Sequence, residues 1–218
     1  MKTVKLLPTG KEFRLNNIFC IGKNYADHAK EMGGDVPKEP VIFLKPTSAV
    51  ITNGEPIIIP SMSSNVHHEI ELTVLLGKGG KNIPLSSAMD HVAGYGVGLD
   101  MTMRDRQSDA KKAGNPWTVA KGFDTSAPLS PFISASSIID PHTLDITLTV
   151  NGEIRQQSNT QHMIFRIEVL ISYLSSIFTL EEGDIIYTGT PEGVAQVGVG
   201  DQLTATIPGV GTIQHTIQ

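Results

Sequence analysis

The stretch NVHHEIELTVLLG, residues 65–77, decides the expected fold, because it predicts a strand that is about to be buried. Its apolar residues alternate with other residues at the two-residue period of a β-strand. Glu69 and Glu71 stand two positions apart, so their side chains point to the same face of that strand. The same face continues to Leu75, which a fully solvated strand face explains poorly.

Strand-like runs of the same kind occur along most of the chain. They cover residues 17–22, 41–46, 56–60, 92–102, 144–150, 184–190 and 202–217. The pair Asn151-Gly152 follows one such run and suits the positive φ angles of a type I′ hairpin turn. The chain is therefore expected to be rich in β-structure.

Helical patterns are fewer and mostly short. Apolar residues recur at helical spacing most clearly in residues 163–180. Further helices are expected at 25–33, at 86–92 with Ser86 or Ser87 as N-cap, and at the charged segment 102–114. Together these patterns predict a β-rich α+β fold with a few peripheral helices, in one domain spanning residues 1–218.

The composition is that of an ordinary globular protein, with 39% hydrophobic and 18% charged residues among 218. The net charge of −5 gives no electrostatic reason to expect a nucleic-acid or membrane partner. The single cysteine, Cys20, cannot form an internal disulfide and indicates a reducing compartment such as the cytoplasm. We expect neither a secretory signal nor a membrane span, since no apolar run approaches the ~18 residues that a span requires.

The two glutamates are best explained by a cation, although most acid pairs at this spacing belong to solvated strand faces. Two carboxylates on one partly buried face repel each other, and a divalent cation between them would remove that repulsion. Asp100 offers a third carboxylate, because it ends a glycine-rich run that lets backbones approach closely. Oxygen donors without a nearby cysteine favour a hard ion, Mg²⁺ first, with Mn²⁺ or Ca²⁺ as alternatives.

Four segments in this order resemble the fumarylacetoacetate hydrolase family. They are HHEIEL (67–72), GYGVGLDMTMRDRQ (94–107), KKAGNPWTVAKGFD (111–124) and GDIIYTGTPEGV (183–194). The likeness runs from FCIGKNYADHAKEMG (19–33) to the C-terminus and is greatest to the short single-domain acylpyruvases and oxaloacetate-processing enzymes. It implies a mixed β-roll or sandwich, a metal-dependent enzyme and a homodimer.

The resemblance also implies the residues of a metal centre. The family holds its metal by a Glu-x-Glu pair on a strand and a later Asp, which correspond to Glu69, Glu71 and Asp100. A lysine beside the metal corresponds to Lys121 in the segment VAKGFD. By residue type alone, Lys121 would otherwise be read as a solvated surface lysine.

Further family positions correspond to a catalytic dyad and to substrate contacts. A His-x-x-Glu dyad on a short helix corresponds to His28 and Glu31, whose i, i+3 spacing lets the carboxylate orient the imidazole. Arg104 and Gln107, one helical turn apart, resemble the family's substrate contacts. Thr190 in GTPEGV resembles a hydroxyl or backbone donor to the substrate carboxylate.

The function implied is metal-dependent hydrolysis of acylpyruvates, which are 2,4-diketo acids, to release pyruvate. The complete dyad favours a reaction that needs activated water. Decarboxylation of oxaloacetate and keto–enol tautomerisation of oxaloacetate or a hydroxymuconate remain open, because the same enolate serves all three reactions. A non-enzymatic metal-binding β protein is the remaining alternative. One departure is Ala195, where relatives often have glycine after GTPxGV.

Overall fold

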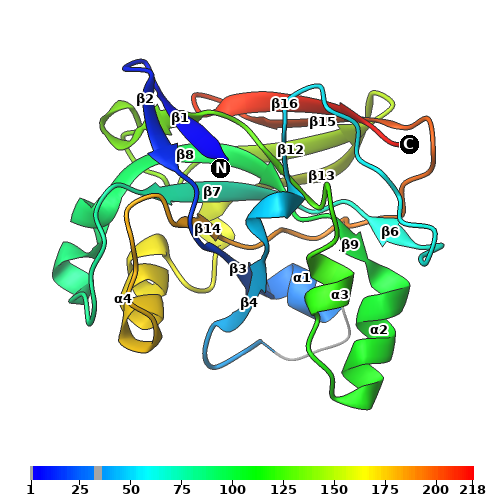
Figure 1. Cartoon of the computed structure of the whole chain (residues 1–218), viewed down its shortest axis with the longest axis horizontal. Helices are drawn as coiled ribbons and strands as arrows, with labels where there is room; N and C mark the ends of the chain where they lie inside the picture. Colours follow the sequence, from blue (N-terminus) through cyan, green and yellow to red (C-terminus); the bar gives the residue numbers. More distant parts are fainter. Residues whose placement is uncertain (1, 32–35) are drawn as a thin grey trace.

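Strands dominate the computed structural model, which describes residues 2–31 and 36–218 (Figure 1). The strands are β1 (Thr3–Leu7), β2 (Lys11–Arg14), β3 (Ile18–Gly22), β4 (Val41–Lys45), β5 (Val50–Thr52), β6 (Val66–His67), β7 (Ile70–Leu76), β8 (Val92–Leu99), β9 (Thr102–Met103), β10 (Ala127–Leu129), β11 (Phe132–Ser134), β12 (Asp145–Val150), β13 (Glu153–Asn159), β14 (Ile185–Tyr187), β15 (Gln202–Ile207) and β16 (Gly211–Thr216). The helices are α1 (Ala26–Glu31), α2 (Arg104–Ala113), α3 (Thr118–Lys121) and α4 (Ile167–Ile177). Short 3₁₀ turns are η1 (Thr47–Ala49), η2 (Leu85–His91), η3 (Ala135–Ser137) and η4 (Thr160–His162).

The larger sheet is mixed and has β7 near its middle. Its main path runs β2-β1-β11-β8-β7-β14-β3-β4, and β10 joins it beside β8 and carries β5. β7 pairs antiparallel with both β8 and β14, whereas β14 pairs parallel with β3. Every residue of β7 is buried, so this strand is covered on both of its faces. The alternation seen in the sequence therefore does not separate a buried face from a solvated one.

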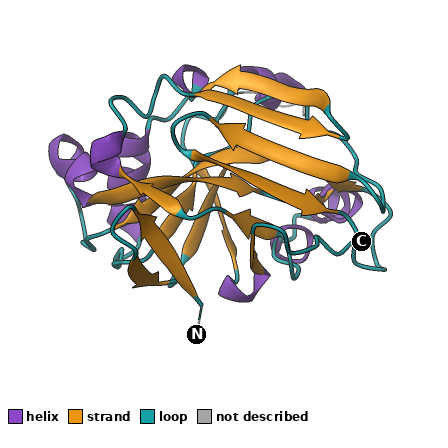
Figure 2. Ribbon diagram, turned by 90° about the horizontal axis from the view of Figure 1, so that it is seen from above, coloured by secondary structure: helices purple, strands orange, loops and turns teal. Residues whose placement is uncertain are grey.

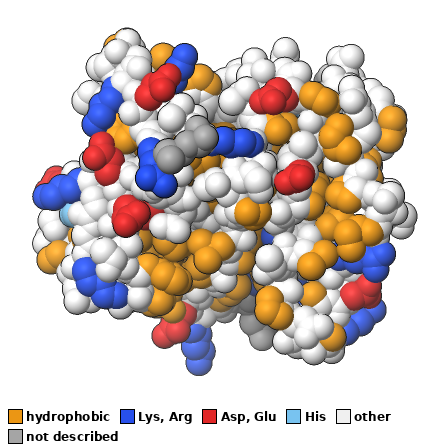
Figure 3. All heavy atoms as spheres, in the orientation of Figure 1, with side chains coloured by type: hydrophobic (Ala, Val, Ile, Leu, Met, Phe, Trp, Pro, Cys, Tyr) orange, Lys and Arg blue, Asp and Glu red, His pale blue; other side chains and the backbone are white. Residues whose placement is uncertain are grey.

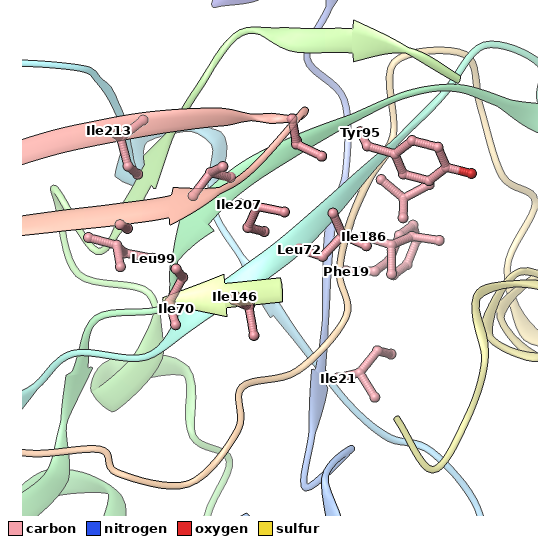
Figure 4. Close-up of a cluster of buried hydrophobic side chains, with 14 of the residues drawn as sticks. Phe19, Ile21, Ile70, Leu72, Tyr95, Leu99, Ile146, Ile186, Ile207 and Ile213 are labelled. Atoms are coloured by element: carbon pink, nitrogen blue, oxygen red, sulfur yellow. The ribbon is translucent and has the colours of Figure 1, made fainter. Parts of the chain in front are cut away.

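The second sheet is antiparallel, in the order β13-β12-β15-β16, and packs against the first. Figure 4 shows Ile146, Ile207 and Ile213 of this sheet in one cluster with side chains of the larger sheet. Ile70 and Leu72 of β7 belong to the same cluster and are fully buried. These apolar contacts hold the two sheets together, in the β-rich α+β fold with peripheral helices that the sequence predicts.

The helices lie outside the sheets, as Figure 2 shows. α4 is the most apolar of them, and its buried residues recur at three- and four-residue spacing: Ile167, Leu170, Ile171 and Leu174. The helix is shorter than the segment 163–180, because Arg166 at its N-cap and Phe178 at its C-cap both have a β conformation.

Two local expectations are wrong, and one element was not predicted. The helix predicted at 86–92 is the 3₁₀ turn η2, which follows Pro84 and has no side-chain cap, so neither serine is an N-cap. The run 56–60 forms no strand, and only an isolated bridge joins Ile57 to Ile217. The N-terminal hairpin of β1 and β2 was not predicted, because its strands have only five and four residues and carry few apolar side chains.

Candidate active site

Three carboxylates meet where β7 begins and β8 ends. Glu69 directly precedes β7, Glu71 lies within it, and Asp100 directly follows β8. Because the two strands run antiparallel, with Glu71 opposite Gly98, these positions lie side by side. The Asp100 amide donates to the Glu69 carbonyl at 2.8 Å. One carboxylate oxygen from each acid lies within 4.8 Å of the other two, and all three side chains are buried.

Gly98 permits this crowding. A Cβ atom at this position would lie 2.5 Å from Cε1 of Tyr187 and 2.6 Å from Cγ2 of Thr73. Real carbon atoms do not approach so closely, so only glycine allows β14 and β8 to pack here without a shift. The glycine-rich run of β8 brings Asp100 to the edge of a cavity, as expected. It does this because Gly98 lets β8 lie close to the side chains of Tyr187 and Thr73.

The surroundings shift the pKa values of Glu69 and Glu71 in opposite directions. Burial acts to raise the pKa of Glu69, but the charges of Lys121 and Arg104 outweigh it and hold that pKa well below its usual range. Burial raises the pKa of Glu71 well above its usual range, and the charges of Asp100 and Glu69 add to the effect. Among the described residues, no cationic side chain forms an ion pair with Glu71.

Two buried lysines approach Asp100. The Lys121 ammonium, at the end of α3, donates to Asp100 Oδ2 and Thr102 Oγ1, both at 2.6 Å, and to Glu69 Oε2 at 2.8 Å. Lys45, at the end of β4, lies 2.8 Å from Asp100 Oδ1. That second pair is a close ion pair rather than a directed hydrogen bond, since Oδ1 has no hydrogen-bond donor among the described residues.

Sequence reasoning placed Lys121 here but did not select Lys45. The available signal was a lysine at the end of the apolar run VIFLK, where a solvated residue is not expected. Lys121 lies on a short helix rather than between strands.

The donor set fits a hard divalent cation. The three acids supply oxygen ligands, and no cysteine or histidine belongs to this cluster of the described residues. A buried Glu71 without a cationic partner and an Asp100 oxygen without a hydrogen bond are the groups that such an ion would satisfy. Glu69, Glu71 and Asp100 are therefore the residues that could hold it.

The expected dyad is formed on α1. His28 Nδ1 lies 3.2 Å from Glu31 Oε2, and the His28 side chain is buried while that of Glu31 is partly exposed. The amide of Gly193 donates to Glu31 Oε1 at 3.2 Å, which ties the helix to the loop after β14. Among the described residues, none forms a hydrogen bond with the other ring nitrogen of His28, Nε2, which is the atom that could transfer a proton.

The predicted substrate contacts come from α2 and from the loop after β14. Arg104, the first residue of α2, pairs with Glu69 and donates through Nη1 to Gln107 Oε1 at 2.7 Å. Because a guanidinium can only donate, this bond fixes Oε1 of Gln107 toward Arg104. The Gln107 amide nitrogen Nε2 then points the other way as a hydrogen-bond donor. Thr190 Oγ1 accepts a hydrogen bond from Gln156 Nε2 at 2.8 Å, and Gln156 is a residue that the sequence did not single out.

One pocket brings these residues together. Eight of the nine site residues predicted from the sequence line it: His28, Glu69, Glu71, Asp100, Arg104, Gln107, Lys121 and Thr190. The ninth, Glu31, reaches it through His28. The cavity measures about 30 Å³, which is room for a water molecule or an ion. Phe43 and Trp117 form its apolar wall.

Comparison with known proteins gives close relatives over nearly the whole chain. The family described as "Fumarylacetoacetate (FAA) hydrolase C-terminal" matches residues 17–218. The mitochondrial oxaloacetate tautomerase FAHD1 of Mus musculus is 52% identical over 202 residues, which are 93% of this chain and 91% of that protein.

Solved structures share the fold. Fumarylpyruvate hydrolase from Pseudomonas aeruginosa, crystallised with Mn²⁺ and pyruvate, is 41% identical with a TM-score of 0.95, covering 99% of this chain and 95% of its own. The 5-carboxymethyl-2-hydroxymuconate delta-isomerase of Mycobacterium smegmatis is 40% identical with a TM-score of 0.84, covering 94% of this chain and 79% of its own. The resemblance first seen in four short motifs thus extends over sequence and fold, and the chain belongs to the fumarylacetoacetate hydrolase family.

Proposed function

We propose that this protein is a metal-dependent hydrolase that cleaves the C3–C4 bond of acylpyruvates and releases pyruvate. The observation that carries the proposal is the cluster of three buried carboxylates, with oxygens within 4.8 Å of one another, in the pocket that His28 also lines. The relative from Pseudomonas aeruginosa, a fumarylpyruvate hydrolase crystallised with Mn²⁺ and pyruvate, supports the same class of reaction.

Glu69, Glu71 and Asp100 would hold the cation, which we expect to be Mg²⁺ with Mn²⁺ or Ca²⁺ as alternatives. When bound there, a divalent ion would act as a Lewis acid on a keto oxygen. It would also stabilise the negative charge that develops on the pyruvyl fragment. Lys121 adds a fixed positive charge at the same place, since its ammonium already contacts Glu69 and Asp100. In a water-poor site such preorganised charge stabilises a developing oxyanion.

The dyad would activate the water. Glu31 faces Nδ1 of His28, so Nε2 takes a proton from water while the carboxylate supports the resulting imidazolium. The hydroxide oxygen bonds to the distal acyl carbon, and the C3–C4 bond breaks with its electron pair left on C3. Protonation of C3 then completes pyruvate, and the acyl part leaves as a carboxylic acid.

The substrate carboxylate would be bound by donors that line the same pocket as the acids. Gln107 presents Nε2, since its Oε1 accepts from Arg104. Thr190 presents its hydroxyl proton, since its oxygen accepts from Gln156. Arg104 adds a guanidinium whose partner in this structure is Glu69. This donor set suits a 2-oxo acid.

Oxaloacetate tautomerisation is the second candidate. The relative from Mus musculus, 52% identical over 93% of this chain, is an oxaloacetate tautomerase. That reaction moves a proton between C3 and the keto oxygen and needs no water nucleophile. It would use the carboxylate site and a proton carrier such as His28, without a base for water.

One assay separates the two. Chelator-treated protein is given acetylpyruvate or oxaloacetate, with and without added Mg²⁺ or Mn²⁺, while the ultraviolet absorbance of the enol and the release of pyruvate are both followed. Metal-dependent pyruvate release from acetylpyruvate is the expected result. Fast enol–keto exchange of oxaloacetate without cleavage of any acylpyruvate would establish the tautomerase instead, and full activity after chelation would refute the carboxylate site.

A further inference from the structure

Gln156 on β13 is a buried polar side chain that connects the start of β7 to the loop after β14. Its Oε1 accepts from the amide of Ile70 at 3.1 Å and lies 3.0 Å from Nδ1 of His68. Its Nε2 donates to the carbonyl of Pro191 at 2.9 Å and to Thr190 Oγ1 at 2.8 Å. All four bonds that its amide atoms make are thus internal to the protein, and the side chain is 1% exposed.

Backbone partners determine which way this amide points. The Ile70 N–H can only donate, and the Pro191 carbonyl can only accept. Reversing the amide would place its NH₂ group against an N–H and its oxygen against a carbonyl oxygen. Nε2 must therefore face Thr190, and Thr190 Oγ1 must be the acceptor in that bond.

The Thr190 hydroxyl consequently does not use its proton in the bond with Gln156. A hydroxyl carries one donor hydrogen, and no described residue accepts it. Thr190 lines the pocket that contains Glu71 and Asp100, so the free proton lies on the wall of the candidate active site. An anionic oxygen within reach of Thr190 Oγ1 would receive a hydrogen bond from a hydroxyl whose oxygen already accepts from Gln156 and whose proton no described residue accepts.

The same loop contacts the other parts of the site. The amide of Gly189 donates to Glu71 Oε2 at 2.6 Å. The amide of Gly193 donates to Glu31 Oε1 at 3.2 Å. Gln156 donates hydrogen bonds to Thr190 and Pro191, which lie between Gly189 and Gly193 in this loop.

We propose that Gln156 is a positioning residue, which orients the Thr190 hydroxyl as a hydrogen-bond donor to the carboxylate of a 2-oxo acid bound in the pocket. The proposal rests on the proposed function in one respect, namely that the ligand is a 2-oxo acid. Gln156 itself touches no substrate, because its amide atoms are all engaged within the protein.

The test measures pyruvate binding by titration calorimetry in saturating Mg²⁺. The variants are Gln156→Met, Thr190→Val, the double variant and Thr190→Ser. Thr190→Val should weaken pyruvate binding by about ten- to a hundredfold, the usual effect of losing a hydrogen bond to a charged group. Gln156→Met should weaken it severalfold, whereas the double variant should bind no more weakly than Thr190→Val alone. Thr190→Ser, which keeps the hydroxyl, should stay close to wild type.

Two controls separate positioning from folding. Gln157→Met alters the exposed neighbour on the same strand and should leave pyruvate binding unchanged. Mg²⁺ affinity should stay within about threefold of wild type in every variant, since the carboxylates are untouched. If Gln156→Met does not fold, Gln156→Glu keeps an acceptor for Ile70, and its buried, protonated carboxyl has a single hydrogen for Pro191 and Thr190 where the amide has two. Pyruvate binding should then weaken, but by no more than in Thr190→Val.

The outcomes are distinct. If Gln156→Met weakens pyruvate binding by the same factor with and without the Thr190 hydroxyl, Gln156 acts through the fold and the proposal is overturned. Wild-type affinity in the folded Gln156 variants overturns it as well. If the wild-type protein with Mg²⁺ binds no pyruvate at all, the proposed function fails first and the role of Gln156 falls with it.

Discussion

Glu71 is the acid of the site whose charge the protein supports least. It is buried beside Asp100 and Glu69, and its oxygen accepts the Gly189 amide at 2.6 Å. Burial and the neighbouring carboxylates raise its pKa well above the usual range. Without metal the folded state therefore keeps a proton on Glu71 to a higher pH than the unfolded chain, in which a glutamate has a pKa of about 4.3. Stability from this group falls as the pH rises from about 4.3 toward the folded-state pKa.

We predict that Glu71→Gln stabilises the metal-free protein at pH 7.5. The amide removes a charge that the site disfavours, so the Tm in chelator should rise by at least about 2–4 °C, the shift for about 1 kcal/mol in a chain of this length. Added Mg²⁺, which should raise the Tm of wild type, should no longer do so. Scanning calorimetry at pH 5 and 7.5 checks both. A Tm lowered equally at the two pH values would show a structural role instead.

A second residue-scale prediction concerns His28 and Glu31. General-base assistance contributes about 10²–10⁴-fold in rate, so His28→Ala should lower acylpyruvate hydrolysis by about that factor. Glu31→Gln keeps the helix and removes only the supporting charge, so its effect should be smaller. Enolisation of oxaloacetate should suffer less in both, since no water is attacked. Steady-state kinetics on acetylpyruvate and oxaloacetate measure this, with Mg²⁺ affinity as the control. Hydrolysis that survives His28→Ala within a few-fold would remove the dyad from the mechanism.

At the scale of elements, the β7–β8 ladder places the acids, and its small residues make that possible. Gly98 lies opposite Glu71 and leaves room for the Tyr187 ring, where a Cβ would come within 2.5 Å. The ring cannot retreat easily, because the Tyr187 hydroxyl donates to the Pro128 carbonyl at 3.0 Å and the whole side chain is buried. Crowding at this point would therefore disturb the ladder itself.

We predict that Gly98→Ala destabilises the protein by about 2–3 kcal/mol, the range for overpacking a filled interior. In a chain of this length that lowers the Tm by about 5–10 °C. Gly211→Ala in β16 is the matched control, because its Cβ would meet nothing closer than 3.8 Å. Thermal melts of both variants decide the matter, and equal Tm values would mean that β14 can move away from β8 at little cost. Mg²⁺ affinity should also fall in Gly98→Ala but not in Gly211→Ala. Glu71 lies opposite Gly98 in the ladder, and Asp100 lies two residues after it.

At the scale of the molecule, β4 is one edge strand of the larger sheet. A groove of about 740 Å³ lies along it, lined mainly by residues 41–47 and 115–118. Leu44 is 46% exposed there, and Val119 on the adjacent α3 is 56% exposed. Figure 3 shows hydrophobic side chains gathered over the area that β4 occupies in Figure 1. An unpaired, apolar edge of this kind favours association with a second copy of the chain.

We therefore predict a homodimer whose interface includes the β4 edge. Leu44→Glu should shift the protein toward monomer at micromolar concentration, because a charge would be buried in the interface. Ile154→Glu is the control, since Ile154 is 58% exposed on β13 in the other sheet. Light scattering coupled to size-exclusion chromatography measures the mass. A monomeric wild type would refute the dimer, and a dimeric Leu44→Glu would move the interface elsewhere.

Two further expectations concern the chain as a whole. Within the described residues, no helix has the length and apolar character needed to cross a membrane. Cys20 is a buried, free thiol whose pKa burial raises well above its usual value, as befits a core residue. The cytoplasmic location and the single domain over residues 1–218 stay predictions.

The sequence by itself determined the strand-rich class, the three clustered acids and the family. Periodicity and short motifs record relations between residues that are near in the chain, such as Glu69 with Glu71 or His28 with Glu31. Asp100 could be added because its motif is specific. The prediction of Ser86 or Ser87 as the N-cap of an α-helix is wrong, because a local helical pattern cannot distinguish an α-helix from the 3₁₀ turn that follows Pro84.

Only the tertiary structure decided which distant side chains complete the site. Lys45 reaches Asp100 because the end of β4 lies against the residues that follow β8, where the Lys45 ammonium also donates to the Met101 carbonyl at 3.3 Å. Gln156 reaches Thr190 because the second sheet lies across the start of β7. Such contacts depend on strand order and sheet packing, and these are selected by burial of the whole core rather than by any local pattern. A buried lysine or glutamine therefore looks like any other polar residue until the chain is folded.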